Sequence, residues 1–232
     1  MKIDFDQWQR TVVAGASQLG VTVSPDQAHA MGAHARELIL WNRTTNLTAI
    51  TDPLDMAVKH YVDSAAAAPW IGQSARVMDA GSGGGFPGIP LNILRPDLSI
   101  TLVDSVRKKV SFLKHAIRTI ELESITAVHG RLETLGRQPA FQGMFDLVIC
   151  RAFSSLEAFA SLATAFLAPG GSLVAMKGPQ KDHPHEEQDD GSGGVPIVLG
   201  GVSFFVQVRH YRLPMLNSQR RLVRLTPLKM DG

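Results

Sequence analysis

The chain has 232 residues, of which 44% are hydrophobic, and 23 basic against 21 acidic residues leave a net charge of +2, too small to indicate nucleic-acid binding by itself. This length allows one large domain, or a domain with a small appendage. A single cysteine, Cys150, excludes a disulfide framework and a thiolate zinc cluster, while the absence of a secretory start or a long apolar run predicts a cytoplasmic protein without a membrane partner.

Helical patterns dominate the first 72 residues. Apolar residues recur at helical spacing over 5–19 and over 25–41, and a third helix is expected over 53–68. We therefore predict an N-terminal helical extension, residues 1–72, that packs on the rest of the chain.

From residue 73 onward, short apolar runs alternate with helix-length segments. Alternation of this kind predicts a parallel sheet with helices on both faces, which is the α/β, Rossmann-like class. The predicted strands are 76–80, 99–103, 125–128, 145–150 and 172–176, and the predicted helices between them are 87–94, 106–122 and 156–166.

The last part of the chain has a different pattern. Residues 178–194 are rich in Pro, Gly, His and acids, which predicts a mobile polar loop. Such a loop also explains His183 and His185 better than a metal site does, so no metal is expected. Two β-like runs, 202–213 and 221–225, follow and are expected to pair as antiparallel neighbours at one edge of the sheet.

A glycine-rich turn, residues 77–88, follows the first predicted strand and precedes a helix. In that context glycines let a ligand approach the backbone closely, as in nucleotide-binding folds. A loop that is rich in glycine only for turning is the weaker alternative. The glycines are Gly81, Gly83, Gly85 and Gly88.

Two acids indicate which cofactor this turn holds. Asp104 ends the second strand about twenty residues beyond the turn, where a carboxylate accepts hydrogen bonds from ribose hydroxyls. Asp79 lies inside the first strand, where an acid suits the ammonium and sulfonium of S-adenosylmethionine better than a pyrophosphate. Residues 73–232 are therefore predicted to form a class I methyltransferase domain. A NAD-binding oxidoreductase is the less favoured alternative, because neither Tyr61 nor Tyr211 has a lysine four residues later.

Further motifs occur in a specific order between Leu38 and Lys177. They are Trp41-Asn42, Asn46-Leu47-Thr48, His60, Asp63-Ser64, the run 79–90, Leu102-Val-Asp-Ser105 and Arg151-Ala-Phe-Ser154. Together they resemble the bacterial 16S rRNA guanine-N7 methyltransferase family, also called glucose-inhibited division protein B or ribosomal RNA small subunit methyltransferase G. The resemblance implies methyl transfer from S-adenosylmethionine to N7 of a guanine in the 530 loop of 16S rRNA, with S-adenosylhomocysteine as product. The implied partner is 16S rRNA or the 30S particle, and we expect a monomer.

The resemblance also implies residues of the cofactor site. These are Gly81 and Phe86 at the turn, Leu132 and Glu133 after the third strand, and Arg151 at the end of the fourth strand. Phe86 also suits the helix core, and Glu133 also suits a helix start, as alternatives. The arguments from the turn add Asp79, Gly83, Gly85 and Asp104 to the predicted cofactor residues.

Guanine N7 carries a free lone pair, so no general base is expected, and the role predicted for Arg151 is positioning. A structural salt bridge is its alternative role, and Phe153 is expected either to stack on the base or to pack in the core. Two basic tracts without acids, 105–120 and 209–229, favour contact with RNA phosphates. The predicted RNA-binding residues are Arg43, Lys108, Lys109, Lys177, Arg220 and Arg221. A methyltransferase acting on another RNA or on a protein, and a non-catalytic RNA-binding module, are the alternatives.

Overall fold

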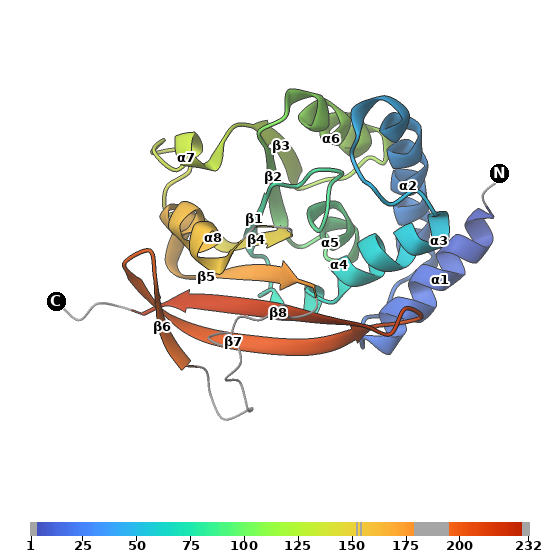
Figure 1. The fold of residues 1–232 in the computed structure, drawn as a ribbon. Coiled ribbons are helices and arrows are strands. Elements are labelled where there is room, and N and C mark those ends of the chain that lie inside the picture. The colour runs from blue at the N-terminus through green and yellow to red at the C-terminus, as the bar shows by residue number, and fades with distance from the viewer. Residues whose placement is uncertain (1–3, 152, 154, 179–194, 229–232) are drawn as a thin grey trace.

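A computed structural model of the protein describes residues 4–151, 153, 155–178 and 195–228, and one mixed sheet runs through the centre of this part (Figure 1). The strand order is β3-β2-β1-β4-β5-β8-β7-β6. The first five strands in sequence are parallel, and the last three pair antiparallel beside β5. The strands are β1 (Arg76–Ala80), β2 (Ser99–Asp104), β3 (Ile125–His129), β4 (Phe145–Arg151), β5 (Leu167–Lys177), β6 (Val195–Leu199), β7 (Val202–Leu213) and β8 (Ser218–Pro227).

Helices cover both faces of the sheet, because successive residues of a strand point to opposite sides. Val77 of β1 joins the core formed with α1, α2, α5 and α6, whereas Met78 joins a second core with α7 and α8. The predicted α/β class with a mostly parallel sheet and an antiparallel edge is therefore confirmed. The helices are α1 (Phe5–Gln18), α2 (Pro25–Thr45), α3 (Pro53–Met56), η1 (Ala57–Val62), α4 (Asp63–Ala65), η2 (Ala68–Trp70), α5 (Gly88–Leu94), α6 (Arg107–Thr119), α7 (Leu132–Leu135), α8 (Leu156–Ala163) and η3 (Thr164–Phe166).

The helices before residue 72 share the first core with the sheet: Trp8 and Tyr61 are fully buried there together with Leu102 of β2. Among the helices described, none is long and apolar enough to cross a membrane. The division of the chain at residue 72 stays a prediction about its organisation.

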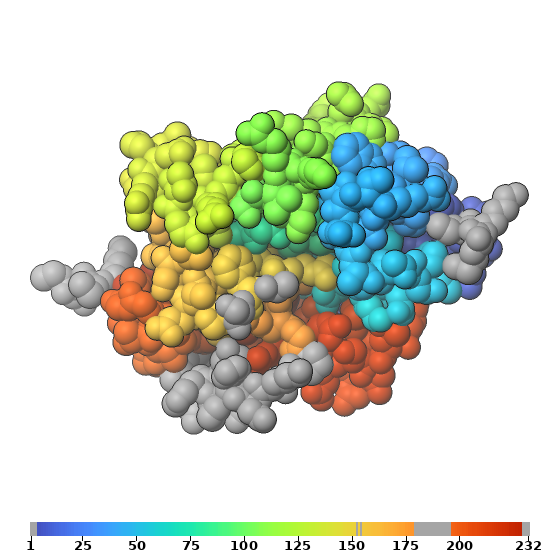
Figure 2. Space-filling model, turned by 45° about the horizontal axis from the view of Figure 1, so that its top comes forward, coloured from blue at the N-terminus to red at the C-terminus, as the bar shows by residue number. Residues whose placement is uncertain are grey.

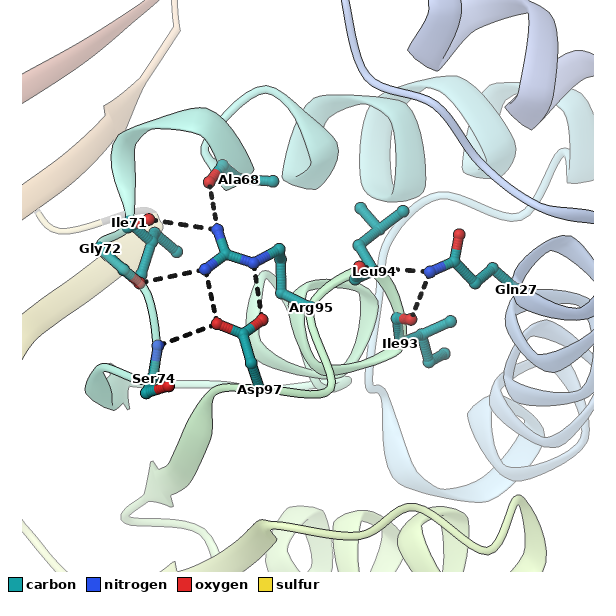
Figure 3. Close-up of polar contacts among 9 residues, drawn as sticks. All are labelled: Gln27, Ala68, Ile71, Gly72, Ser74, Ile93, Leu94, Arg95 and Asp97. Atoms are coloured by element: carbon teal, nitrogen blue, oxygen red, sulfur yellow. Dashed lines mark hydrogen bonds and ion pairs between the residues drawn. The ribbon is translucent and has the colours of Figure 1, made fainter.

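Polar contacts fix this helical extension to the loop after α5 (Figure 3). The side-chain amide of Gln27 donates to the carbonyls of Ile93 and Leu94 at 3.0 and 3.2 Å, which occupies acceptors at the end of α5. Arg95 is paired with Asp97, which also accepts from the backbone N–H of Ser74. The same guanidinium donates to the carbonyls of Ala68, Ile71 and Gly72 at 3.3, 3.2 and 3.1 Å.

Replacing Arg95 with methionine is expected to lower the free energy of unfolding by about 1–2 kcal/mol, because three carbonyls lose a charged donor at a partly solvated position. Urea unfolding measures the change. Arg76→Met is the matched control, since Arg76 also pairs with an aspartate, Asp146, but with side chains 47% and 42% exposed. Equal losses in both variants would contradict a specific role of Arg95 in holding the extension.

The structure differs from the sequence-based expectation in several local elements: the short helix α7 was not predicted, and β5 begins at Leu167 rather than at residue 172. The single helix expected over 53–68 contains a π-helical segment, η1, between α3 and α4. A strand that was not predicted, β6, pairs with β7 at the edge of the sheet. Its second residue is Pro196, and proline is tolerated in edge strands because no ladder hydrogen bond is needed on the outer side. The predicted polar loop, including His183 and His185, falls mostly on residues 179–194, outside the described part.

Candidate active site

The glycine-rich turn is bound to the end of β2 by backbone and carboxylate hydrogen bonds. Val103 O accepts from the N–H groups of Gly81 and Ser82 at 2.9 and 3.0 Å. Asp104 accepts from Gly83 N–H through Oδ2 at 3.0 Å and from Val106 N–H through Oδ1 at 2.8 Å. Because each carboxylate oxygen has a second lone pair, Asp104 can still accept a hydrogen bond from a ligand hydroxyl.

A cavity of about 290 Å³ opens beside this turn, and we call it the glycine-turn cavity. Of the predicted cofactor residues, Gly81, Asp104, Leu132 and Glu133 line it. Gly81 has φ of +78°, and a Cβ placed there would meet no atom within 4 Å, so the missing side chain leaves room at the cavity wall. The other lining residues are Val103, Ser105, Gly130, Arg131, Phe153 and Leu162.

Asp79 does not line the glycine-turn cavity: it is fully buried beneath the turn. Its Oδ2 accepts from Gly88 N–H at 2.9 Å, and its Oδ1 has no hydrogen-bond partner in the described structure. Burial raises the pKa of this carboxyl to about 7. A Cβ on Gly88 would lie 2.8 Å from Oδ2 and 2.2 Å from Leu102 Cδ2, so this glycine is required by close packing of α5 on the sheet.

Neither Phe86 nor Gly85 lines the glycine-turn cavity. Phe86 is buried and stacks on His60 with ring centroids 4.4 Å apart. A Cβ on Gly85 would lie 2.5 Å from Ile89 Cδ1, which indicates a packing requirement. Phe86 therefore lies in the core, which is the alternative position considered for it. Its stacking on His60 connects the glycine-rich turn to η1.

Arg151 ends β4 and is held by η1. Its Nη2 donates to Lys59 O at 3.0 Å and lies 3.3 Å from Nδ1 of His60. Since a guanidinium only donates, Nδ1 accepts and the His60 proton lies on Nε2, which then donates to Thr48 Oγ1 at 2.7 Å. Burial, followed by the charge of Arg151, lowers the pKa of His60 to about 3, so this ring is neutral at physiological pH.

A second cavity, of about 400 Å³, lies in front of Arg151 and has a basic wall; we call it the basic cavity. The buried carboxylate of Asp63 lies in this wall, 3.7 Å from Arg151 Nη2 and 3.6 Å from Arg220 Nε. Lys177 donates to Phe153 O at 2.9 Å. The lining residues are Ile50, Lys59, Asp63, Arg151, Phe153, Met176, Lys177, Gly178 and Arg220.

Phe153 lines both cavities, so they meet at the carboxyl end of β4. This is the edge of the sheet where the strand order reverses between β1 and β4, and ligands of open α/β sheets bind there. Figure 2 shows a face of the molecule on which the blue α2, green α6, yellow-green α7 and amber α8 segments gather above the orange-red hairpin β7–β8. Arg151 belongs to the basic cavity and does not line the glycine-turn cavity.

The predicted RNA-binding residues occupy three kinds of position. Arg43 and Lys108 are exposed, and Lys109 is half-buried in the first turn of α6. Lys177 and Arg220 line the basic cavity. Arg221 is only 5% exposed, which does not suit a surface contact with RNA. Neighbouring residues of a strand point to opposite faces, and Arg220 lies on the face toward the helical extension, beside Asp63.

Sequence reasoning did not assign a role to Lys59, Asp63 or Tyr211, although His60 and Asp63 stand in a quoted motif. Tyr211 Oη donates to Asp63 Oδ1 at 2.8 Å across 148 residues of sequence. The motif that contains His60 and Asp63 could have indicated that residues of η1 and α4 belong to the site. No local pattern in the sequence points to Tyr211. Ala152, Ser154 and Lys229, which fall in predicted motifs or tracts, lie outside the described residues.

Two buried neutral histidines predict loss of stability in acid. Burial lowers the pKa of His34 to about 3, as for His60, whereas 6.5 is the ordinary value. As the pH falls below 6.5 the unfolded chain therefore takes up protons that the folded chain does not, and stability decreases until about pH 3. Between neutral pH and pH 5 each histidine is expected to cost about 2 kcal/mol.

Urea unfolding of a His34→Gln variant at several pH values tests this expectation. The variant should lose part of the pH dependence, so its stability approaches that of the parent protein as the pH falls. His29→Gln is the control, since His29 is exposed on the same helix, α2. Parallel pH curves for the parent and His34→Gln proteins would refute the assignment.

Comparisons with known proteins were consistent with one another. The sequence model of the family described as rRNA small subunit methyltransferase G matches residues 27–195. The chain is 40% identical over 209 residues to the ribosomal RNA small subunit methyltransferase G of Geobacter sp. (strain M21), covering 90% of this chain and 93% of that protein. It is 38% identical over 212 residues to the protein of the same name from Geobacter metallireducens, covering 91% and 93%. A SAM-dependent methyltransferase structure from Aquifex aeolicus matches with a TM-score of 0.54 at 12% identity, over 79% of this chain and 97% of that one, which supports the fold.

Proposed function

The chain belongs to the rRNA small subunit methyltransferase G family, and on that premise we propose that it transfers a methyl group from S-adenosylmethionine to N7 of a guanine in the 530 loop of 16S rRNA. It is a methyltransferase that uses S-adenosylmethionine. The position N7, the 530 loop, a monomeric state and a cytoplasmic location are part of the proposal. The observation that carries it is the junction of the glycine-turn cavity and the basic cavity at Phe153.

The glycine-turn cavity has the features that the cofactor needs. Gly81 leaves the wall open where a Cβ would stand, and Asp104 offers acceptors for ribose hydroxyls. We propose that Leu132 and Glu133 lie beside the adenine, and that Asp79, Gly83, Gly85 and Phe86 support the site from beneath the turn. When bound, S-adenosylmethionine supplies an electrophilic methyl group on a sulfonium.

The basic cavity is proposed to hold the target guanine. N7 carries a lone pair and no proton, so the chain has no proton to remove, in agreement with a neutral His60 that is already bonded to Thr48. The remaining task is alignment of N7 with the methyl carbon, and positioning of this kind contributes roughly 7–11 kcal/mol in favourable cases. Arg151 Nη1 is buried without a hydrogen-bond partner in the described structure, and we propose that an acceptor on the bound base or its phosphate satisfies it.

Cations around this face are proposed to bind the RNA backbone. Arg107, Lys108 and Lys109 stand in the first turn of α6, where positive charge opposes the helix dipole. A position that is unfavourable for the helix suggests a use in binding phosphate. Arg43, at the end of α2, and Lys177 and Arg220, in the basic cavity, complete the proposed contacts.

Removing one of these charges should weaken binding to 30S particles and lower the salt dependence. We expect Lys108→Gln to reduce the slope of log affinity against log salt concentration by about one. Filter binding across a salt series measures the slope. Arg10→Gln, which removes an exposed cation on α1, is the control, and equal slopes in the two variants would contradict a phosphate contact at Lys108.

The proposed reaction is tested with labelled S-adenosylmethionine and 30S particles from a strain that lacks the modification. We expect label in 16S rRNA, at N7 of one guanine in the 530 loop. Label on another base or on a ribosomal protein would overturn the named substrate and favour a methyltransferase with another target. Absence of S-adenosylhomocysteine binding in calorimetry would favour a non-catalytic RNA-binding module.

A further inference from the structure

Asp63 is a buried acid that receives partners from three strands. Tyr211 of β7 donates to its Oδ1 at 2.8 Å, and Arg220 of β8 lies 3.6 Å from the same oxygen. Arg151 of β4 lies 3.7 Å from Oδ2. Asp63 is 5% exposed, so one carboxylate joins the helical extension to both the parallel and the antiparallel part of the sheet.

The helix around Asp63 places a second acceptor beside it. η1 ends at Val62, and Lys59 O accepts from the same Nη2 of Arg151 that faces Asp63. The wider π-helical turn therefore presents a carbonyl and, four residues later, a carboxylate to one guanidinium. Single π-turns of this kind are frequent at functional sites.

The distances show what the carboxylate does for the two arginines. At 3.6 and 3.7 Å the contacts with Arg220 and Arg151 are ion pairs rather than hydrogen bonds. Two guanidiniums that share a partly buried wall repel each other, and the single negative charge between them offsets that repulsion. The carboxylate takes no hydrogen bond from either guanidinium. Arg151 Nη2 donates to Lys59 O, and Arg220 Nη1 donates to Ser218 Oγ and Gln219 O, so the other N–H groups of the two side chains are the donors left for a ligand.

We propose that Asp63 is a positioning residue of the basic cavity: it fixes Arg151 and Arg220 so that their N–H groups face oxygen acceptors of the target nucleotide. Tyr211 sets the orientation of the carboxylate through its hydrogen bond. This inference rests on the proposed function. It gives a part in aligning the base to Asp63, which does not line the glycine-turn cavity.

The test is single-turnover methylation with full-length Asp63→Asn protein, labelled S-adenosylmethionine and saturating 30S particles. Asparagine keeps the shape and removes the charge, so we expect the rate constant to fall about 100-fold, the loss that a misplacement of about 1 Å produces. Calorimetry with S-adenosylhomocysteine should give the affinity and stoichiometry of the parent protein. A merely structural role would instead lower the stoichiometry and the amplitude of the turnover, and leave the rate constant unchanged.

Two variants complete the experiment. Asp146→Asn removes another aspartate–arginine pair at the opposite end of β4 and should retain the parent rate constant. Tyr211→Phe should lower the rate constant less than Asp63→Asn does. If the Asp63→Asn protein does not fold, the rate constant of Tyr211→Phe tests the inference in its place. Rate constants within about twofold of the parent in every folded variant of Asp63 and Tyr211 would overturn the inference. Parent protein that transfers no label to the particles would instead refute the proposed function.

Discussion

Replacing Gly81 with valine is expected to weaken the binding of S-adenosylhomocysteine strongly while the chain still folds. Gly81 has φ of +78° and lines the glycine-turn cavity, and no atom lies within 4 Å of the place of a Cβ. A branched side chain would therefore stand in the space that the ligand needs. We expect the dissociation constant to rise at least about 100-fold, which corresponds to about 2.8 kcal/mol.

The valine also adds backbone strain, because a positive φ costs an L-residue roughly 1–2 kcal/mol. Gly20→Val separates the two effects: Gly20 has φ of +77° and open space around it, but it follows α1, away from both cavities. Both variants should lose similar stability in urea unfolding, and only Gly81→Val should lose ligand binding in calorimetry. Ligand binding that survives in Gly81→Val would remove this residue from the proposed cofactor site.

Local sequence patterns predicted the parts of this protein that depend on neighbours in the chain. The strands of the parallel sheet show as apolar runs, and the glycine turn is recognisable because strand, turn and helix are consecutive. Asp104 was found in the same way, since its distance from the turn follows from one β-α-β unit. These features need no information about distant residues.

The basic cavity could not be predicted in this way. Tyr211 and Asp63 are 148 residues apart, and their pairing depends on where β7 ends up beside the helical extension. η1 has no local signature either, and it packs against α1, where Gly15 lies close to Val62. The alternation along β8 could not be resolved from the sequence either: two adjacent arginines look equal there, but Arg220 lines the cavity and Arg221 is buried.

The role of Asp79 differs from the one that the sequence suggested, although the cofactor inferred from it, S-adenosylmethionine, is correct. An acid inside the first strand favoured a cationic cofactor, yet the structure buries this carboxyl under the turn, where it holds Gly88 N–H. With its pKa raised to about 7, the carboxyl is partly protonated near neutral pH, and a nearby cation would favour its ionised form. Its contribution is therefore proposed to be shaping the turn and adding negative charge beneath it, without direct contact with the ligand.

Replacing Arg151 with methionine is expected to lower kcat/KM for 30S methylation about 10²–10³-fold, as the loss of one preorganised hydrogen-bond donor does at other sites. Methionine keeps much of the aliphatic bulk and removes every N–H group, including the free Nη1. Binding of S-adenosylhomocysteine should persist, because Arg151 lines the basic cavity and not the glycine-turn cavity. Loss of ligand binding together with activity would instead place Arg151 in the cofactor site.

Arg151→Lys sharpens this prediction. Lysine retains the charge, but a single ammonium cannot contact Lys59 O, His60 Nδ1 and Asp63 while offering a further donor in a fixed plane. We therefore expect it to restore only a small part of the activity lost in Arg151→Met. Arg76→Met, which breaks an exposed ion pair near the start of β1, should keep full activity. If Arg151→Lys matched the parent protein, charge alone would be sufficient, and the fixed geometry of the guanidinium would have no part in aligning the base.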